Sequence, residues 1–129
     1  MVDRAGTPLA CLITPANAHD GWYLRPLVQQ VRRRVGVLAG CKGHADKGYD
    51  QPRNRSALAE AGAENRIART KIDSGGLGRH RYVVERSFSH LSGFHRLERC
   101  YERDPWQHLA FLQLACGLKL ARTIVKSGC

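Results

Sequence analysis

Apolar residues recur every three or four positions in two stretches of the chain, which predicts an amphipathic helix in each. In the first stretch the apolar positions are Leu24, Leu27, Val28, Val31 and Val35. The preceding Asp20 is expected to cap this helix, because a carboxylate at that position accepts a hydrogen bond from a free backbone N–H group. In the second stretch the apolar positions are Val84, Phe88, Leu91, Phe94, Leu97 and Tyr101. This spacing predicts one long helix from about Arg81 to Arg103, with Gly93 as its weak point.

A third helix is predicted from Asp104 to about Lys126. Asp104-Pro105-Trp106-Gln107 has the form of a capping box, with Pro105 at the first helical position. The helix is apolar nearly all round, so we expect it to be buried, with Trp106 and Phe111 in the core rather than stacked on bases. Its apolar run is shorter than the ~20 residues that span a bilayer, and no membrane partner is expected.

The first half of the chain alternates short strands with helices. Met1–Asp3 and Pro8–Thr14 are predicted to pair as a hairpin, and Gly40–Ala45 is predicted to be a strand that ends at Asp46. A helix over Pro52–Ala61, closed by Gly62, leads to another strand around Ile67. The order strand, helix, strand favours a parallel sheet with helices against it, and hence the α/β class.

Length and composition allow one soluble domain. The chain has 129 residues, of which 43% are hydrophobic and 25% charged. We divide it into residues 1–72 with the hairpin and the strand–helix–strand part, a glycine-rich connection at residues 73–80, and a helical part at residues 81–129. The glycines of the connection lack the lysine and hydroxyl residue that end a phosphate-binding loop.

The chain is strongly basic. The 21 Lys and Arg residues against 11 Asp and Glu residues give a formal charge of +10, which favours a polyanionic partner. Five widely spaced cysteines without a Cys-x-x-Cys pair indicate reduced thiols rather than a disulfide framework or a zinc ribbon. With an acidic residue near the start and no long apolar run there, no export signal is predicted, and a cytoplasmic location is expected.

Two carboxylates stand out by their settings. Asp46 follows a predicted strand, at the sheet edge where ligand sites of open α/β folds gather. Glu85 lies in a basic stretch, and on a helix it would share a face with Arg81 and Arg96. From spacing alone, the alternative for Glu85 is an ordinary ion pair with Arg81, worth ~0.2–0.5 kcal/mol to the helix.

Five segments in the same order resemble the carboxyl-terminal part of bacterial insertion-sequence transposases of the DDE type, most closely the insertion sequence five family. They are Val2–Ala10, Thr14–Asp20, Ala45–Asp50, Arg81–Leu91 and Phe94–Arg103. Together these segments cover nearly the whole chain. Asp46 matches the second aspartate of the family, and Glu85 matches the glutamate of its Tyr-x2-Arg-x3-Glu-x6-Lys signature, whose arginine is Arg81.

The resemblance implies an RNase H-like catalytic core that binds Mg²⁺ or Mn²⁺ through Asp46 and Glu85. It implies a DNA transposase that hydrolyses a phosphodiester at the element's ends and joins the 3′-hydroxyl to target DNA. Such a transposase is expected to associate with the bacterial nucleoid when bound to DNA and to act as a homodimer. The basic residues expected to contact the DNA backbone are Lys47, Arg81, Arg86 and Arg96.

The chain departs from the family pattern at three places. Gly78 stands at the signature tyrosine, Ser92 stands at the signature lysine, and the first catalytic aspartate is expected upstream of the hairpin. The core is therefore expected to be truncated at its amino terminus, without its first strand, ahead of a long helical half. Two hypotheses follow: a transposase catalytic region, incomplete as it stands, or an inactive remnant that at most binds DNA.

Overall fold

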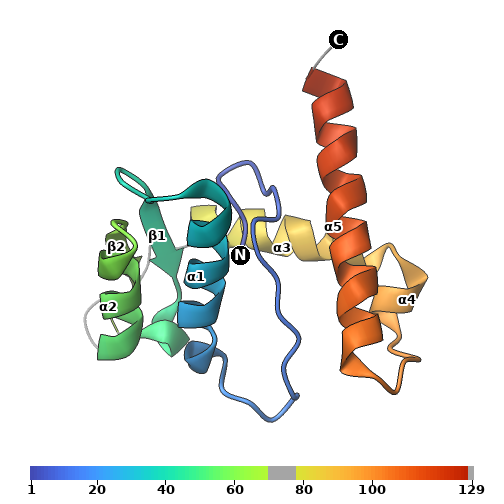
Figure 1. Ribbon diagram of the computed structural model, residues 1–129, viewed down its shortest axis with the longest axis horizontal. Coiled ribbons are helices and arrows are strands. Elements are labelled where there is room, and N and C mark those ends of the chain that lie inside the picture. The colour runs from blue at the N-terminus through green and yellow to red at the C-terminus, as the bar shows by residue number, and fades with distance from the viewer. Residues whose placement is uncertain (70–77, 128–129) are drawn as a thin grey trace. The chain divides into compact units, whose positions relative to one another are not determined.

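A computed structural model describes residues 1–69 and 78–127 of the chain (Figure 1). In the first half the elements are the 3₁₀ turn η1 (Asp20–Trp22), α1 (Leu24–Val35), β1 (Lys42–Ala45), the 3₁₀ turn η2 (Lys47–Tyr49), α2 (Pro52–Glu60) and β2 (Glu64–Ile67). In the second half they are α3 (Gly78–Ser92), α4 (His95–Glu98) and α5 (Pro105–Ser127). Of the predicted glycine-rich connection, residues 73–77 lie outside the described residues.

The chain forms two compact units. The sheet unit consists of Thr14–His80, and the helical unit consists of Met1–Ile13 together with Arg81–Cys129. The boundary between them falls within α3. Each unit is described below by itself.

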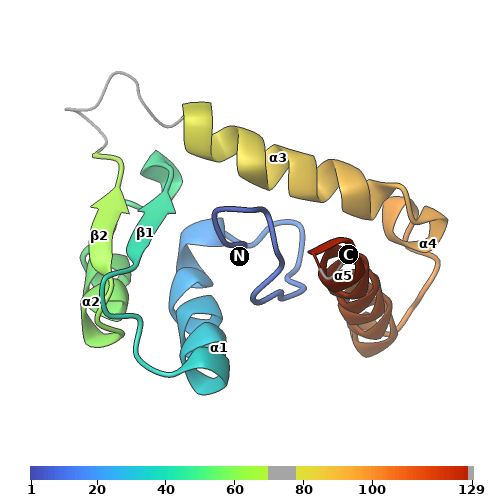
Figure 2. The ribbon, with the colours of Figure 1, turned by 90° about the horizontal axis from the view of Figure 1, so that it is seen from above.

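The sheet unit contains the predicted strand–helix–strand arrangement. β1 and β2 are parallel, with a register that runs from Lys42 opposite Glu64 to Ala45 opposite Ile67, and the two arrows run the same way in Figure 2. α2 connects the strands, as a parallel pair requires. The prediction of a parallel sheet with helices is confirmed, and with it the mixed α/β class.

A small apolar core holds the sheet unit together. Its buried members come from α1, α2, β2 and the residues around them: Leu24, Val28, Leu58, Ala61, Ala63 and Ile67. α2 packs closely on β1, since a Cβ atom added at Gly43 would lie 2.6 Å from Cδ2 of Leu58. Gly43 therefore lets this helix approach the sheet.

The first helix begins later than predicted. His19, rather than Asp20, caps the opening turn, and its Nδ1 accepts the N–H of Gly21 at 3.1 Å. Asp20 is itself the first residue of η1, so it lies inside the turn that the prediction had it capping. α1 starts only after Tyr23, and the prediction of an Asp20 cap is wrong.

In the helical unit the amino-terminal segment is a short hairpin with a tight turn. A single antiparallel bridge joins Val2 to Pro8, and Oδ1 of Asp3 accepts the N–H groups of Ala5 and Thr7. Gly6 has a φ of +83°, a left-handed conformation that favours glycine. Besides this bridge, the N–H of Leu9 donates to the carbonyl of Met1 and the amino group of Met1 donates to the carbonyl of Ala10, so the predicted hairpin is present in a short form.

The predicted long helix is two helices. α3 ends at Ser92, and α4 begins at His95 after Phe94, whose backbone is extended at φ −92° and ψ 110°. Glycine is a poor helix former, and Gly93 stands where the helix ends. The weak point in the sequence is therefore a break, and the prediction of one helix to Arg103 is wrong.

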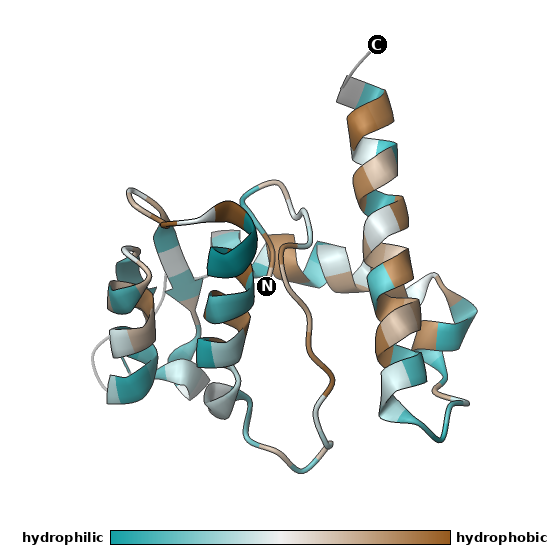
Figure 3. Ribbon diagram, in the orientation of Figure 1, coloured by the Kyte–Doolittle hydropathy of each residue, from teal (hydrophilic) through white to brown (hydrophobic). Residues whose placement is uncertain are grey.

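The last helix has the predicted start but not the predicted burial. Oδ1 of Asp104 accepts the N–H of Trp106 at 3.0 Å, and Pro105 is the first helical residue. Ala115 and Cys116 are buried, but Trp106 is 76% exposed and Ile124 is 68% exposed. Apolar bands follow one another along α5 in Figure 3. The prediction that α5 is a core helix, with Trp106 in the core, is wrong.

By length and composition, the segment Pro105–Lys126 of α5 could also cross a membrane, and only 11% of its most apolar stretch is buried in this structure. Core helices of soluble proteins can have the same length and apolar composition, so one such helix is weak support for a membrane segment.

Candidate active site

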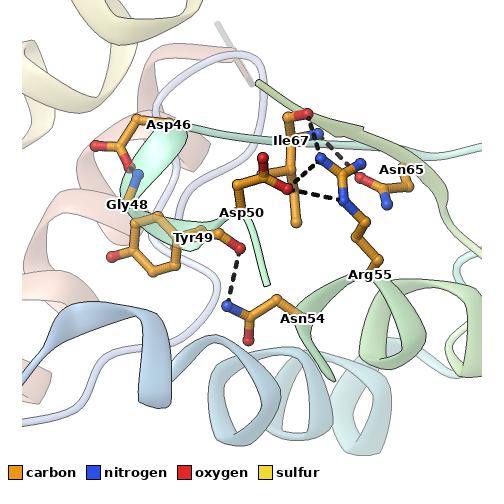
Figure 4. Close-up of polar contacts among 8 residues, drawn as sticks. All are labelled: Asp46, Gly48, Tyr49, Asp50, Asn54, Arg55, Asn65 and Ile67. Atoms are coloured by element: carbon orange, nitrogen blue, oxygen red, sulfur yellow. Dashed lines mark hydrogen bonds and ion pairs between the residues drawn. The ribbon is translucent and has the colours of Figure 1, made fainter. Parts of the chain in front are cut away.

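Asp46 stands directly after β1, at the carboxyl end of a parallel strand. Its side chain caps η2, because Oδ1 accepts the N–H of Gly48 at 3.0 Å (Figure 4). The residue is exposed, and Lys47 beside it is also exposed. The structure therefore places Asp46 as the sequence predicted, with its backbone fixed by the turn and its carboxylate open to solvent.

The loop after Asp46 is fastened to α2 and β2. Oδ1 of Asp50 accepts from Arg55 at 2.6 Å and 3.1 Å, and Arg55 also donates to the carbonyl of Ile67 (Figure 4). The carboxylate of Asp50 is thus engaged in an ion pair that ties the loop to the end of β2. Asp50 is a positioning residue for Asp46 rather than a second free carboxylate.

Asn54 of α2 also holds the loop that follows Asp46. Its side chain is fully buried, and its amide nitrogen donates to the carbonyls of Gly21 and Tyr49 at 2.9 Å and 3.0 Å. One amide thereby joins η1 to the end of η2. Neither Asn54 nor Arg55 was predicted from the sequence, although polar residues in the first turns of a helix that follows the loop of a candidate site residue are a usable signal.

Tyr49 packs against the core of the sheet unit, close to the loop. Burial raises the pKa of its hydroxyl, and the negative charges of Asp20 and Asp46 raise it further. The hydroxyl therefore stays protonated at neutral pH and can donate a hydrogen bond.

Glu85 lies on α3 and is paired with Arg81. Nε of Arg81 donates to Oε1 of Glu85 at 3.0 Å, and both side chains are largely exposed. The i,i+4 pair that the sequence analysis weighed for these residues is present. The pair occupies one carboxylate oxygen, so it is compatible with a metal ligand but does not by itself indicate one.

The other two predicted DNA contacts have partners within the helical unit. Arg86 donates to the carbonyl of Ala5 at 2.8 Å and lies over the ring of Tyr82. Arg96 donates to Oε1 of Glu102 at 2.7 Å and lies 4.9 Å from the centre of the Phe111 ring. These guanidinium groups hold the unit together, and a DNA contact would have to use their remaining N–H groups.

The predicted site residues are divided between the units. Asp46 and Lys47 belong to the sheet unit, while Arg81, Glu85, Arg86 and Arg96 belong to the helical unit. The structure thus brings Arg81 to Glu85 and supports the loop of Asp46. Within the described parts of either unit, the site carboxylates do not join a cluster of three potential metal ligands.

A basic pocket on the helical unit was not predicted. It lies between α3 and α5, has a volume of about 230 Å³, and is lined in part by His90, Lys119, Arg122 and Lys126. The last three are spaced three and four residues apart on α5, a pattern that the sequence already contained. Such a row of cations is suited to a phosphate backbone.

Lys119 is committed to the unit's own structure. Its ammonium group donates to the carbonyl of Gly6 at 2.7 Å and to Oγ of Ser87 at 3.1 Å. Burial lowers its pKa, and the positive charge of Arg86 lowers it further, against the opposing charges of Cys116 and Asp3.

With this geometry established, comparison with known proteins decides the family. Residues 1–118 match the family model described as Transposase DDE domain. The chain belongs to this family. The resemblance that the sequence segments carried is thereby confirmed, and a DDE domain implies an RNase H-like fold.

Two relatives are transposases of insertion sequences. The chain is 40% identical over 128 residues to "Putative transposase for insertion sequence element IS402" from Burkholderia cepacia, a match that covers 92% of this chain and 59% of the relative. It is 37% identical over 90 residues to "Transposase for insertion sequence element IS1106" from Neisseria meningitidis serogroup B, which covers 61% of this chain and 29% of that relative. No solved structure matches the chain significantly. The DDE chain thus spans less than two thirds of the length of these curated relatives.

Proposed function

We propose that this chain is the part of a DNA transposase catalytic region that carries the second aspartate, Asp46, and the glutamate, Glu85. The reaction is metal-dependent phosphodiester hydrolysis at the element's ends, followed by strand transfer to target DNA. The family match over residues 1–118 is the observation that carries the proposal, because it includes both carboxylates in the order the family requires. In this proposal the two units are parts of one catalytic domain.

The donor set fits a hard divalent cation. Asp46 and Glu85 offer exposed carboxylate oxygens, the ligands that Mg²⁺ and Mn²⁺ prefer, and each has only one oxygen in a hydrogen bond within the described residues. When bound, such ions supply activation of a water or a 3′-hydroxyl and stabilise the leaving oxygen. Asp46 would hold its ion at the end of β1, and Glu85 would hold its ion from α3.

Other residues of the chain would position the carboxylate of Asp46 and the phosphodiester. The turn that Asp46 caps, fastened through Asp50, Arg55 and Asn54, keeps the carboxylate in place without covering it. Lys47 would position the phosphate backbone next to Asp46, and Arg81 would do so next to Glu85. Contacts of this kind need charge rather than base recognition, so they fix position and not sequence.

We propose that a third carboxylate completes this set and that, in the order of the family pattern, it belongs to a strand that precedes the hairpin. The share of the relatives' length that lies outside the match leaves room for such a strand. Pairing of two transposon ends by a homodimer, and a cytoplasmic protein that associates with the nucleoid, are parts of the same proposal.

The alternative is a DNA-binding remnant that does not cut. It is favoured by Gly78 and Ser92, which stand where the family signature has its tyrosine and its lysine. The two proposals share the basic surface and differ in cleavage alone.

Nicking of supercoiled plasmid DNA with Mg²⁺ or Mn²⁺ separates them. If the chain cleaves, Asp46→Ala and Glu85→Ala should each abolish nicking while retention of the plasmid in a gel-shift assay changes little. Glu98→Ala is the matched control, because Glu98 is an exposed carboxylate on α4 outside the proposed site. Retained nicking in both site variants would refute the assignment of the two carboxylates. Binding without any nicking by the parent chain would favour the remnant.

A further inference from the structure

Three potential metal ligands of different chemistry meet where the chain turns from α4 into α5. They are the thiol of Cys100, the carboxylate of Glu102 and the imidazole of His108, and one ligand atom from each lies within 4.8 Å of the others. Cys100 and Glu102 stand in the connection between the helices, and His108 stands in the first turns of α5. All three belong to the helical unit.

Two atoms of this cluster are buried and have no hydrogen-bond partner. They are Oε2 of Glu102 and Nδ1 of His108, and they face each other at 3.9 Å, which is too long for a hydrogen bond. The side chain of Glu102 is only 4% exposed. Buried polar atoms without partners are costly, and a bound cation would satisfy both at once.

The carboxylate of Glu102 is oriented by Arg96. Arg96 occupies Oε1 at 2.7 Å and leaves Oε2 directed at His108. A carboxylate ligand oriented by a second hydrogen-bonded group is a recurring feature of metal sites.

The mixture of donors selects the kind of cation. Thiolate and imidazole ligands suit Zn²⁺ and related borderline ions, whereas Mg²⁺ and Mn²⁺ prefer oxygen ligands alone. Three protein ligands leave a fourth position for water, as in open tetrahedral zinc sites. With metal–ligand bonds of about 2.0–2.3 Å, the ligand atoms of a tetrahedral site lie roughly 3.5 Å from one another. The distances between the ligand atoms of Cys100, Glu102 and His108, which are at most 4.8 Å, would therefore have to shorten by about 1 Å. Cys100 is exposed, and its Sγ makes one long contact of 3.6 Å, to the backbone carbonyl of Glu102, which metal binding would replace.

We propose that Cys100, Glu102 and His108 bind a Zn²⁺ ion that fixes the connection between α4 and α5. The site is separate from the proposed Mg²⁺ ligands Asp46 and Glu85, and it does not depend on the proposed DNA cleavage. Arg96 serves it as a positioning residue, because its guanidinium holds Glu102 from the other oxygen. The thiol of Cys100 loses its proton to solvent on binding, so uptake of the ion releases H⁺.

Titration of the reduced, metal-free 129-residue chain with Co²⁺, followed by displacement with Zn²⁺, tests the site. The chain should take up a single Co²⁺ with a sulfur-to-cobalt absorption band in the near ultraviolet, and Zn²⁺ should abolish that band. Cys100→Ser should remove the band, and His108→Gln should weaken Co²⁺ binding by about tenfold or more. Cys41→Ser is the matched control, since Cys41 is an exposed thiol of the sheet unit and its loss should leave the titration unchanged.

Cys100→His provides a second variant that keeps a ligand at the same position. It should bind Zn²⁺ while the sulfur-to-cobalt band disappears, a result that a merely unfolded variant would not give. The proposal is overturned if the parent chain shows no such band, if the band survives Cys100→Ser, or if Cys41→Ser removes it. It is also overturned if Cys100→His and Cys100→Ser bind Zn²⁺ with the same affinity as the parent.

Discussion

The sheet unit encloses an apolar cluster between α1, α2 and β2, whereas in the helical unit polar groups of α3 and α5 converge on one backbone carbonyl. In the sheet unit Leu58 is 3% exposed and packs on the glycine of the neighbouring strand. In the helical unit the carbonyl of Gly6 accepts from both Ser87 and Lys119, while apolar side chains such as Phe88 stay 67% exposed. The two regions therefore depend on different forces, although they belong to one chain.

The comparison teaches that an apolar residue at helical spacing is not by itself a core residue. Burial needs a second surface, and α1 and α2 have one in each other and in the sheet. α3 and α5 carry as many apolar positions, but among the described residues little covers them. Substitutions that remove either an apolar contact or a polar contact can measure how much each kind contributes to the stability of each unit.

The largest effect is expected from Leu58→Ala. It removes buried methyl groups between α2 and β1 and should cost about 2–5 kcal/mol of stability in the sheet unit. Hydrogen exchange followed by mass spectrometry should show faster exchange in α2 and the strands, with little change in α5. Val37→Ala is the control, because Val37 is 68% exposed. Equal acceleration in both units would mean that they unfold as one.

A smaller effect is expected from Ser87→Ala in the helical unit. The variant loses the hydrogen bond from Ser87 to Gly6 and the one from Lys119 to Ser87, for a cost of about 1 kcal/mol. The carbonyl of Gly6 keeps Lys119, which limits the loss. Exchange should rise in the amino-terminal turn and in α3. Ser89→Ala, on the exposed side of α3, should change nothing measurable, and an effect of equal size there would contradict the role given to Ser87.

Acidification should weaken the sheet unit selectively. Burial lowers the pKa of His44 below 6.5, and the charges of His80, Arg66 and Lys42 lower it further, against an opposing Glu64. The folded sheet unit then binds fewer protons than the unfolded chain. The full stability of the sheet unit is therefore present above pH 6.5, and part of it is lost as the pH falls through the pKa of His44 in the folded state. His44 is mostly exposed, so the effect should be modest. Urea titrations at several pH values should show it in the parent chain, with a flatter profile for His44→Asn.

The smallest effect is expected from Arg81→Gln. The pair with Glu85 is exposed at both ends and is worth only ~0.2–0.5 kcal/mol. Thermal unfolding should hardly change, whereas plasmid binding or nicking should fall if Arg81 contacts the phosphate backbone. A large loss of stability would show that the pair supports the helical unit instead. Arg99→Gln, on an exposed residue beyond α4, serves as the charge-matched control.

Local sequence signals predicted the local elements well. The strand before Asp46, the helix that starts at Pro52, the turn at Gly62 and the cap at Asp104 all depend on a few neighbouring residues, and the structure has each of them. The i,i+4 contact between Arg81 and Glu85 is of the same kind. Such features need no knowledge of what the rest of the chain does.

The predictions that failed depend on distant surroundings. The burial of α5 was predicted from its apolar composition, but composition does not specify which partner covers a helix. Continuity through Gly93 was predicted from the spacing of apolar residues, which extended past the glycine. The cluster of Cys100, Glu102 and His108 was missed because these residues do not follow a familiar metal-ligand spacing. The polar support of Asp46 by Asn54 and Arg55 likewise required the folded loop.

The break at Gly93 has a consequence for how this chain can vary in length. In one continuous helix, each inserted residue would turn everything beyond it by about 100° and change which side chains share a face with Glu85. Because α3 ends at Ser92 and Phe94 is extended, an insertion or deletion at this point leaves the helical register of Glu85 untouched. Insertions or deletions after α3 therefore do not change which side chains share a helix face with Glu85.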